Sequence, residues 1–309
     1  MVKQTAFRSK RFSEVYKFRF YYLLLVPAVF WYLLFCYVPM GGIVVAFQDY
    51  NFMKGPFGSP WVGFMWFEKM FTSSDFFEVL RNTVIISFAT IVVTFPAPII
   101  FALMLNDCRS VPFKRVIQTV SYLPHFISWS IVAGLIVTML SPSVGIVNQV
   151  IKLLGQEPIY FMAEPDYIRA IMVLSSLWKG LGWSTIIYLA AIAGISQEQY
   201  ESAILDGANK LQQILYITLP GISYIIVMTL IFAVSGLFSV GFEQAYNLVI
   251  PATYDKGQVL STYVYRIGVR NMQYSFSTAV GLAQSVVSML LIVGANAAAK
   301  KINPDGAIW

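Results

Sequence analysis

The sequence is poor in the residues from which most enzyme and metal sites are built. Its 309 residues include one histidine and two cysteines, and Cys36 and Cys108 form neither a disulfide framework nor a Cys/His metal pattern. The motifs GxxxxGK[ST], GxSxG, HExxH and CxxC are absent. His125 has no nearby nucleophile motif. We therefore predict no catalytic residue, no metal site and no P-loop for ATP in this chain.

The sequence is also poor in charge. Charged residues make up 12% of the chain, which is about half the fraction of an ordinary soluble domain, whereas 58% is hydrophobic. This leaves too little polar surface to cover a globule, so the bilayer is the expected solvent. Windows of about 20 apolar residues, the length that crosses a membrane, occur at 20–47, 83–106, 116–140, 170–195, 217–239 and 277–299. We predict an all-α polytopic membrane protein with six transmembrane helices.

The first window is too long for the apolar core of a signal peptide and lacks its cleavage pattern, so we expect a retained helix. Prolines within the first two windows predict kinks in a packed bundle. These prolines are Pro27, Pro39, Pro96 and Pro98.

Lysine and arginine predict the orientation of the spans. The stretch before the first span holds six of the 21 basic residues, Lys3, Arg8, Lys10, Arg11, Lys17 and Arg19. The loops on the same side and the C-terminus hold six more, whereas the three longer loops on the other side hold eight. The positive-inside rule then places both termini in the cytoplasm. We interpret the basic tail as a topology signal and expect no nucleic acid as a partner. The domains are a tail at 1–19, a six-span domain at 20–299 and a tail at 300–309.

The loop at 196–216 has the pattern of two short helices joined at a glycine. Ser196 and Gln199 fit a capping box, and Asp206 can cap the second helix after the turn at Gly207. Small and apolar residues at helical spacing form one face that suits a groove on another protein. They are Tyr200, Ala203, Ile204, Gly207, Ala208, Leu211, Ile214 and Leu215. The alternative, a helix lying on lipid, predicts a more basic polar face than Lys210 alone provides.

This loop resembles the EAA loop of ABC-importer permeases. Residues 201–208 read ESAILDGA and residues 217–220 read ITLP, against a family pattern of E-A-A-x-x-D-G-A followed by I-x-L-P. Ser202 replaces the usual alanine, and Ile214 stands where phenylalanine is common. Further stretches resemble the LplB-like branch, which handles oligosaccharides and polysaccharide fragments. They are WVGF at 61–64 with Phe67, LRNT at 80–83, GFEQ at 241–244 and STYVYR at 261–266.

The resemblance implies the type I ABC importer (MetI-like) permease fold in the plasma membrane of a prokaryote. It implies that the loop is a coupling helix, which sits in a cleft of a cytoplasmic ATPase and moves when ATP closes the ATPase dimer. The residues implied in that contact are Glu201, Ala203, Asp206, Gly207, Ala208 and Leu211. The implied partners are a second, homologous permease, two ATPase subunits that carry ATP-Mg, and an extracytoplasmic substrate-binding protein. The chain itself would bind no cofactor.

Lys179 is the most unusual residue inside a predicted span, at roughly 13 Å depth by helix rise. A cation there requires a partner or water. One interpretation is a cavity residue on the sugar path, helped by Trp178 and Trp183. The other is an interfacial lysine or an ion pair with another subunit. Gly180 and Gly182 predict close helix approach.

Glu243 and Gln244 follow the fifth span on the predicted outer side. Their carboxylate and amide could hydrogen-bond sugar hydroxyls. They could equally contact a delivery protein or cap a helix end.

Three other kinds of membrane protein compete with the permease. A secondary transporter of a small solute, driven by an ion gradient, usually shows acidic residues inside its spans or an internal repeat, and the windows above show neither. A membrane enzyme needs a cluster of carboxylates or histidines at a membrane face. A scaffold without transport leaves the punctuated loop at 196–216 unexplained.

Overall fold

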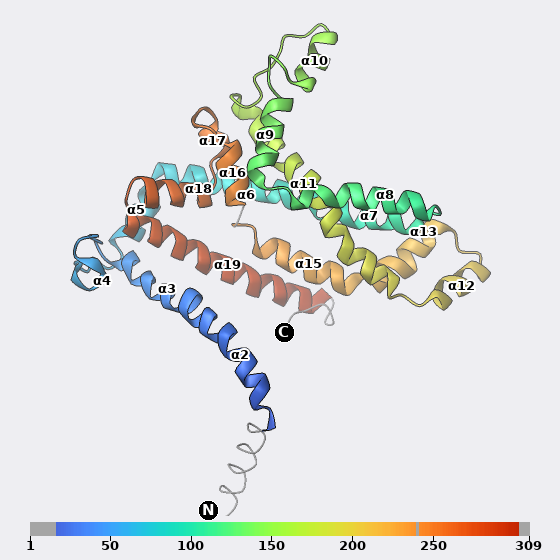
Figure 1. Cartoon of the computed structure of the whole chain (residues 1–309), viewed down its shortest axis with the longest axis horizontal. Coiled ribbons are helices and arrows are strands. Elements are labelled where there is room, and N and C mark those ends of the chain that lie inside the picture. Colours follow the sequence, from blue (N-terminus) through green and yellow to red (C-terminus); the bar gives the residue numbers. More distant parts are fainter. Residues whose placement is uncertain (1–16, 239–240, 303–309) are drawn as a thin grey trace, which may run out of the picture.

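The computed structural model describes residues 17–238 and 241–302, and helices dominate these ranges (Figure 1). The predicted all-α fold is confirmed. Within the described ranges the extended structure amounts to one isolated antiparallel bridge between Gln48 and Trp61. Much of the basic N-terminal tail and the end of the chain after residue 302 lie outside these ranges, so the orientation drawn from them stays a prediction.

Helices follow one another along the chain with short connections. The α-helices are α2 (Arg19–Tyr32), α3 (Val38–Met40), α4 (Gly55–Gly58), α5 (Met65–Thr72), α6 (Ser74–Thr94), α7 (Pro96–Asp107), α8 (Val111–Tyr122), α9 (Trp129–Met139), α10 (Ile146–Leu153), α11 (Pro165–Ala193), α12 (Gln197–Leu205), α13 (Lys210–Gln213), α14 (Leu219–Gly221), α15 (Ser223–Ser235), α16 (Phe242–Leu248), α17 (Tyr254–Gly257), α18 (Leu260–Tyr265) and α19 (Tyr274–Ile302). The 3₁₀ segments are Gly41–Phe47, Leu123–Phe126 and Pro251–Thr253, and the π-helical turns are Leu33–Tyr37, Ile214–Thr218 and Arg266–Arg270.

Four continuous helical segments are long and apolar enough to cross a membrane: Arg19–Phe47, Ser74–Asp107, Pro165–Ala193 and Tyr274–Lys301. Two further candidates are bent pairs. Val111–Phe126 and Trp129–Met139 meet at 105°, and Lys210–Gly221 and Ser223–Ser235 meet at 64°. Counting each pair as one span gives the six predicted spans. The sequence did not predict the sharp bend in the third span.

Helices α2 and α3 of the first span stand apart from the rest of the bundle (Figure 1), whereas its last segment, Gly41–Phe47, packs on α19. None of its membrane-length window is buried, although its mean hydropathy is 2.0. An apolar surface of this length requires lipid or another protein around it. In the second span the helix is interrupted at Phe95, where Pro96 follows. Proline lacks the N–H that would continue the hydrogen-bond ladder, so one helical hydrogen bond is missing there.

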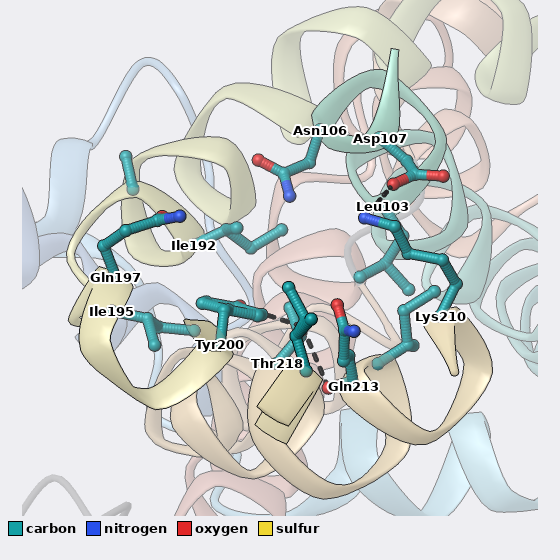
Figure 2. A pocket seen from close by; sticks show the side chains of 13 residues that line it. Leu103, Asn106, Asp107, Ile192, Ile195, Gln197, Tyr200, Lys210, Gln213 and Thr218 are labelled. Carbon is teal, nitrogen blue, oxygen red and sulfur yellow. Dashed lines mark hydrogen bonds and ion pairs between the residues drawn. The ribbon is translucent and has the colours of Figure 1, made fainter. Parts of the chain in front are cut away.

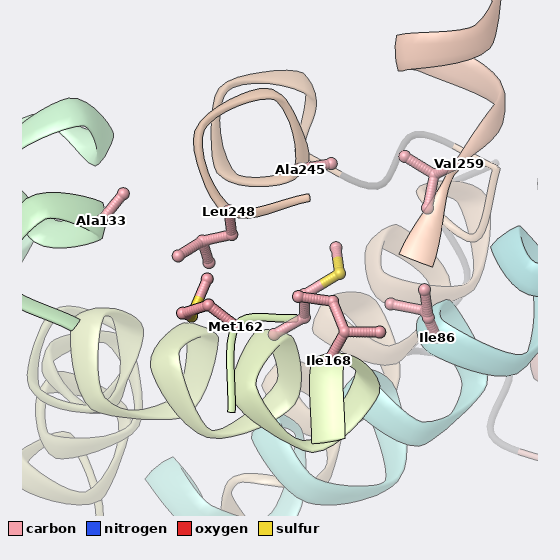
Figure 3. Packing of buried hydrophobic residues seen from close by; sticks show 8 residues of the cluster. Ile86, Ala133, Met162, Ile168, Ala245, Leu248 and Val259 are labelled. Atoms are coloured by element: carbon pink, nitrogen blue, oxygen red, sulfur yellow. The ribbon is translucent and has the colours of Figure 1, made fainter. Parts of the chain in front are cut away.

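A buried cluster joins the middle of the chain to its last third (Figure 3). It brings Ile86 of α6, Ala133 of α9 and Ile168 of α11 together with Ala245 and Leu248 of α16. Each of these side chains is at most 3% exposed. Close packing of this kind fixes the short helices α9 and α16 against the long helix α11. Both α9 and α16 therefore have a defined place although neither is long enough to span a bilayer alone.

Candidate coupling surface and transport-path residues

The turn between α12 and α13 is a Schellman motif, the hydrogen-bonded closure that commonly ends an α-helix. The Gly207 N–H donates to the Ile204 carbonyl at 3.0 Å, and the Ala208 N–H donates to the Ala203 carbonyl at 2.8 Å. Gly207 has a φ of +81°, a left-handed conformation that glycine adopts without a steric penalty. The prediction of two short helices joined at a glycine is confirmed.

The predicted caps are wrong. The Ser196 side chain makes no capping hydrogen bond to α12. Asp206 ends α12 rather than beginning the next helix, because the Schellman turn adds residues before α13 starts. Asn209 and Gln212 form the capping box instead, with bonds of 2.7 and 2.9 Å. The pattern N-x-x-Q at 209–212 was the signal that could have found it.

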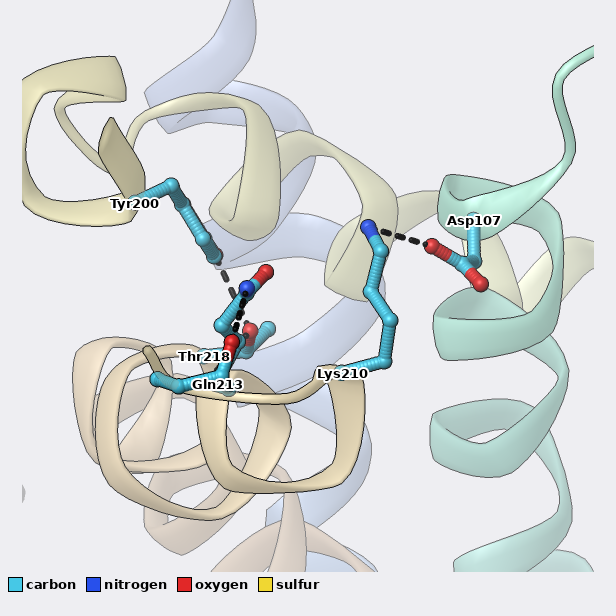
Figure 4. Close-up of polar contacts among 6 residues, drawn as sticks. Asp107, Tyr200, Lys210, Gln213 and Thr218 are labelled. Atoms are coloured by element: carbon cyan, nitrogen blue, oxygen red, sulfur yellow. Dashed lines mark hydrogen bonds and ion pairs between the residues drawn. The ribbon is translucent and has the colours of Figure 1, made fainter. Parts of the chain in front are cut away.

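Two polar contacts hold the loop against the bundle, and a third lies within the loop (Figure 4). The hydroxyls of Tyr200 and Thr218 are hydrogen-bonded at 2.9 Å, which joins α12 to the start of the fifth span. The Gln213 amide donates to the carbonyl of Ala208 at 3.0 Å. Lys210 Nζ lies 2.9 Å from a carboxylate oxygen of Asp107, at the end of α7. Side chains therefore link the loop to two spans.

A pocket of about 270 Å³ lies between this loop and the ends of α7 and α11 (Figure 2). Its polar lining includes Asn106, Gln197, Tyr200, Lys210 and Gln213. Because the pocket lies between the loop and the bundle, the polar contacts among its lining residues join the two.

The residues expected to contact an ATPase differ in exposure. Glu201, Asp206 and Gly207 are exposed, whereas Ala203 and Ala208 are half-buried. Apolar side chains beside them also face outward. Leu205 is 88% exposed and Leu211 is 65% exposed. Sequence reasoning missed Leu205, which lies off the predicted apolar face and can be placed only once the turn is known.

Lys179 binds the backbone at the bend between α8 and α9. Its Nζ donates to the carbonyls of Pro124 at 3.1 Å, His125 at 2.8 Å and Ile127. The ammonium has three N–H groups, and this arrangement uses all three. Within the described ranges Lys179 forms no ion pair. Neither predicted interpretation included this arrangement, in which the cation binds carbonyls at the bend. The Pro124 carbonyl also accepts from the Ile127 N–H at 3.3 Å.

Gly182 lies one turn further along α11 and touches the same region. A Cβ there would clash with the carbonyl of Ser121 near the end of α8, so the two helices meet backbone to backbone. The close approach predicted for Gly182 is confirmed. At Gly180 an added Cβ would meet no atom of another helix within 4 Å in the described ranges, so no close approach within this chain occurs there.

The two predicted tryptophans separate. Trp183 stacks on His125, with ring centroids 4.4 Å apart and planes 3° apart. Trp178 is 49% exposed and lines two apolar grooves, one beside α9 and one beside α8.

Gln244 is 4% exposed and ties α16 to α11. Its amide donates to the Met172 carbonyl at 2.6 Å and to Ser175 Oγ at 2.9 Å, and its oxygen accepts from Ser176. This geometry gives no support to a sugar contact by Gln244. Glu243, its neighbour, is exposed. Sequence adjacency therefore does not place the two side chains in one site.

These features define a helical, multi-pass membrane protein that presents a rigid helix pair at one end of its bundle. The chain belongs to the family described as the binding-protein-dependent transport system inner membrane component, whose sequence model matches residues 94–305.

Curated relatives match over almost the whole chain. Protein LplB of Bacillus subtilis (strain 168) is 43% identical over 285 residues, which cover 92% of this chain and 90% of that protein. The polygalacturonan/rhamnogalacturonan transport system permease protein YteP of the same organism is 40% identical over 299 residues, covering 97% and 93%.

Solved structures match equally well. A chain of a bacterial ABC transporter involved in the import of the acidic polysaccharide alginate aligns with a TM-score of 0.89 and 38% identity, covering 95% of this chain and 99% of that one. A second structure, of the alginate transporter in complex with an alginate pentasaccharide-bound periplasmic protein, aligns with a TM-score of 0.87 and 38% identity, covering 94% and 97%.

Proposed function

We propose that this chain is a permease subunit of an ATP-driven ABC importer. With a second, homologous permease it forms the membrane pathway for an oligosaccharide or polysaccharide fragment. An extracytoplasmic binding protein delivers the substrate, and two cytoplasmic ATPase subunits carrying ATP-Mg drive the cycle. This chain binds no cofactor and catalyses no reaction. Both of its termini lie in the cytoplasm.

The observation that carries the proposal is the closed helix pair at 197–213. It exposes the apolar side chains of Leu205 and Leu211 at the end of the bundle, and it is joined to α7 and to the fifth span by polar contacts. A flexible tether could not transmit the closure of an ATPase to the membrane helices. A capped helix pair that is joined to those helices by a hydrogen bond and an ion pair can do so. The family match and the transport systems named for the relatives support the same conclusion.

The proposal is tested by purifying the tagged chain in mild detergent after expression from its chromosomal locus, with mass spectrometry of what co-purifies. We expect a second six-span protein and a P-loop ATPase. A chain that purifies alone would contradict the proposal and favour the ion-gradient-driven transporter.

A matched pair of variants locates the contact. Leu205→Asp places a charge on the proposed coupling surface, and Leu153→Asp places one on α10, where Leu153 is 86% exposed. We expect Leu205→Asp to lose the ATPase and Leu153→Asp to retain it. Equal retention by both variants would show that this loop is not the ATPase contact.

A further inference from the structure

A second polar site lies between the fifth and sixth spans, at the opposite end of the bundle from α12 (Figure 1). It is a pocket of about 300 Å³ enclosed by α16, α17, α18 and the π-helical turn Arg266–Arg270. This volume is at the lower end of the range of small-molecule sites. Its polar and aromatic lining consists of Tyr246, Tyr254, Gln258, Tyr265, Arg266 and Arg270.

Two arginines give the pocket a positive charge. Arg266 Nη2 donates to the Gln258 side-chain oxygen at 3.0 Å, and Arg270 Nη2 donates to the Tyr246 hydroxyl at 3.0 Å. In the described part of the chain no carboxylate forms an ion pair with either guanidinium. A guanidinium carries five N–H donors in a planar fork that matches a carboxylate. Both arginines therefore have the charge and the geometry to bind an anion from outside the chain.

The backbone fixes the turn that bears the arginines. Gly268 lies midway between them and packs on α19, where an added Cβ would come within 2.8 Å of Ser277 Cβ. The turn is thereby held against α19 by its glycine, while both arginine side chains line the pocket. Single π-helical turns are frequent at functional sites.

Aromatic rings border the same pocket. Tyr246 stacks on Phe242 with centroids 5.3 Å apart and planes 21° apart, and it meets Tyr265 edge to face at 5.4 Å. The Arg270 guanidinium lies 5.8 Å from the centroid of the Tyr246 ring and 6.0 Å from that of Tyr265. Tyr246 is 42% exposed, so a ligand that binds Arg270 also meets these tyrosines. The C–H face of a pyranose packs on such rings, and their hydroxyls bond to sugar hydroxyls. Arginine beside tyrosine thus matches a sugar that carries a carboxylate.

We propose that this pocket binds a uronate residue of an anionic oligosaccharide, with the carboxylate on Arg270 and Arg266 and the sugar ring against Tyr246 and Tyr265. The inference rests on the proposed function and adds the charge of the substrate and the place where that charge is recognised. A neutral oligosaccharide would leave two guanidinium groups beside it without a counter-charge.

The test is direct binding to the intact complex of both permeases and the ATPases in nanodiscs, without the binding protein. The probes are trigalacturonate and its fully methyl-esterified form, compared by saturation-transfer NMR. We expect the acid to bind about tenfold or more tightly than the ester, as befits charge-assisted bonds. Arg270→Gln and Arg266→Gln should lower acid binding to the level of the ester and leave the ester unchanged. Arg81→Gln, at an exposed arginine of α6 outside the pocket, should keep the preference for the acid.

Arg270→Lys retains the charge without the planar fork, so it should bind the acid with intermediate affinity. That result would show that the glutamine variants lose acid binding through the lost charge and not through misfolding. Equal binding of acid and ester, or a preference that survives both glutamine substitutions, would overturn the inference. Loss of binding-protein association in Arg270→Gln, with sugar binding unchanged, would assign the pocket to an acidic side chain of the binding protein. ATP-dependent uptake by the wild-type complex with its binding protein is measured in parallel. Its absence would overturn the proposed function, whereas uptake with no preference for the acid overturns only this inference.

Discussion

Two breaks in the helical structure of this chain are stabilised in different ways. At the bend between α8 and α9, Lys179 donates to three backbone carbonyls and Gly182 brings α11 onto the backbone of α8. At the turn between α12 and α13, a capping box, a hydroxyl pair and an exposed ion pair hold the loop. The first break lies inside a predicted span, where Lys179 is half-buried and Pro124 is buried. The second is solvated, so each contact there contributes less and the loop can shift without unfolding the bundle.

The largest expected effect is that of Lys179→Met, which removes the donor from all three carbonyls at the first break. The Pro124 carbonyl keeps the Ile127 N–H as a partner, so the carbonyls of His125 and Ile127 are the ones left unpaired. A buried polar group left unpaired costs about 1–3 kcal/mol, so we expect a loss of about 3 kcal/mol in the free energy of unfolding. The measurement is reversible unfolding of the purified chain in mixed micelles. Lys152→Met, at an exposed lysine of α10, is the control and should change little.

A Lys179→Met variant as stable as Lys152→Met, but defective in sugar uptake, would instead support the sugar-path interpretation of Lys179. That result would mean that Lys179 does not stabilise the first break, and the contrast between the two breaks would no longer hold.

Gly182→Ala is expected to have the next largest effect. The added Cβ clashes with the Ser121 carbonyl, and backbone atoms cannot rotate away as a side chain does. Overpacking of this kind costs about 1–3 kcal/mol. Gly180→Ala lies two residues away and meets nothing within 4 Å, so it should be neutral or slightly stabilising, since alanine favours helix. Thermal unfolding of the two variants side by side measures the difference, and equal melting temperatures would contradict the close approach.

Much of this fold could be predicted from the sequence because span length and apolar character are local properties. The loop at 196–216 was also predictable in outline, since Gly207 permits a turn between two segments of helical spacing. Its caps were not, because the Schellman closure inserts residues before the second helix and moves the cap from Asp206 to Asn209. The role of Lys179 could not be predicted, because its partners lie more than 50 residues away in sequence and are backbone carbonyls. Arg266 and Arg270 likewise became a site only when α16 was placed beside them.

Substitutions at Gly207 distinguish two effects: the backbone conformation that the second break needs, and the space that a partner protein needs at its surface. Its positive φ costs an ordinary L-residue about 1 kcal/mol, whereas asparagine tolerates this conformation. Apart from the adjacent residues, no atom of the described ranges lies within 4 Å of an added Cβ, so Gly207→Asn should fold like the wild type. We expect both Gly207→Asn and Gly207→Leu to weaken ATPase association, because a side chain would hold the two surfaces apart. Pull-down of the ATPase measures the association, and normal import by Gly207→Leu would contradict the hypothesis.

The smallest expected effect is that of the ion pair between Lys210 and Asp107. The two side chains are 68% and 54% exposed, and exposed pairs contribute only about 0.2–1 kcal/mol. A double-mutant cycle with Lys210→Met and Asp107→Asn should give a coupling energy in this range that shrinks as salt is added, because salt screens exposed charges. Coupling above that range, or coupling insensitive to salt, would mean that the second break is held as rigidly as the first. Because the pair joins α13 to α7, a weak and screened bond here would let the loop move relative to α7 while Tyr200 and Thr218 keep α12 connected to the fifth span.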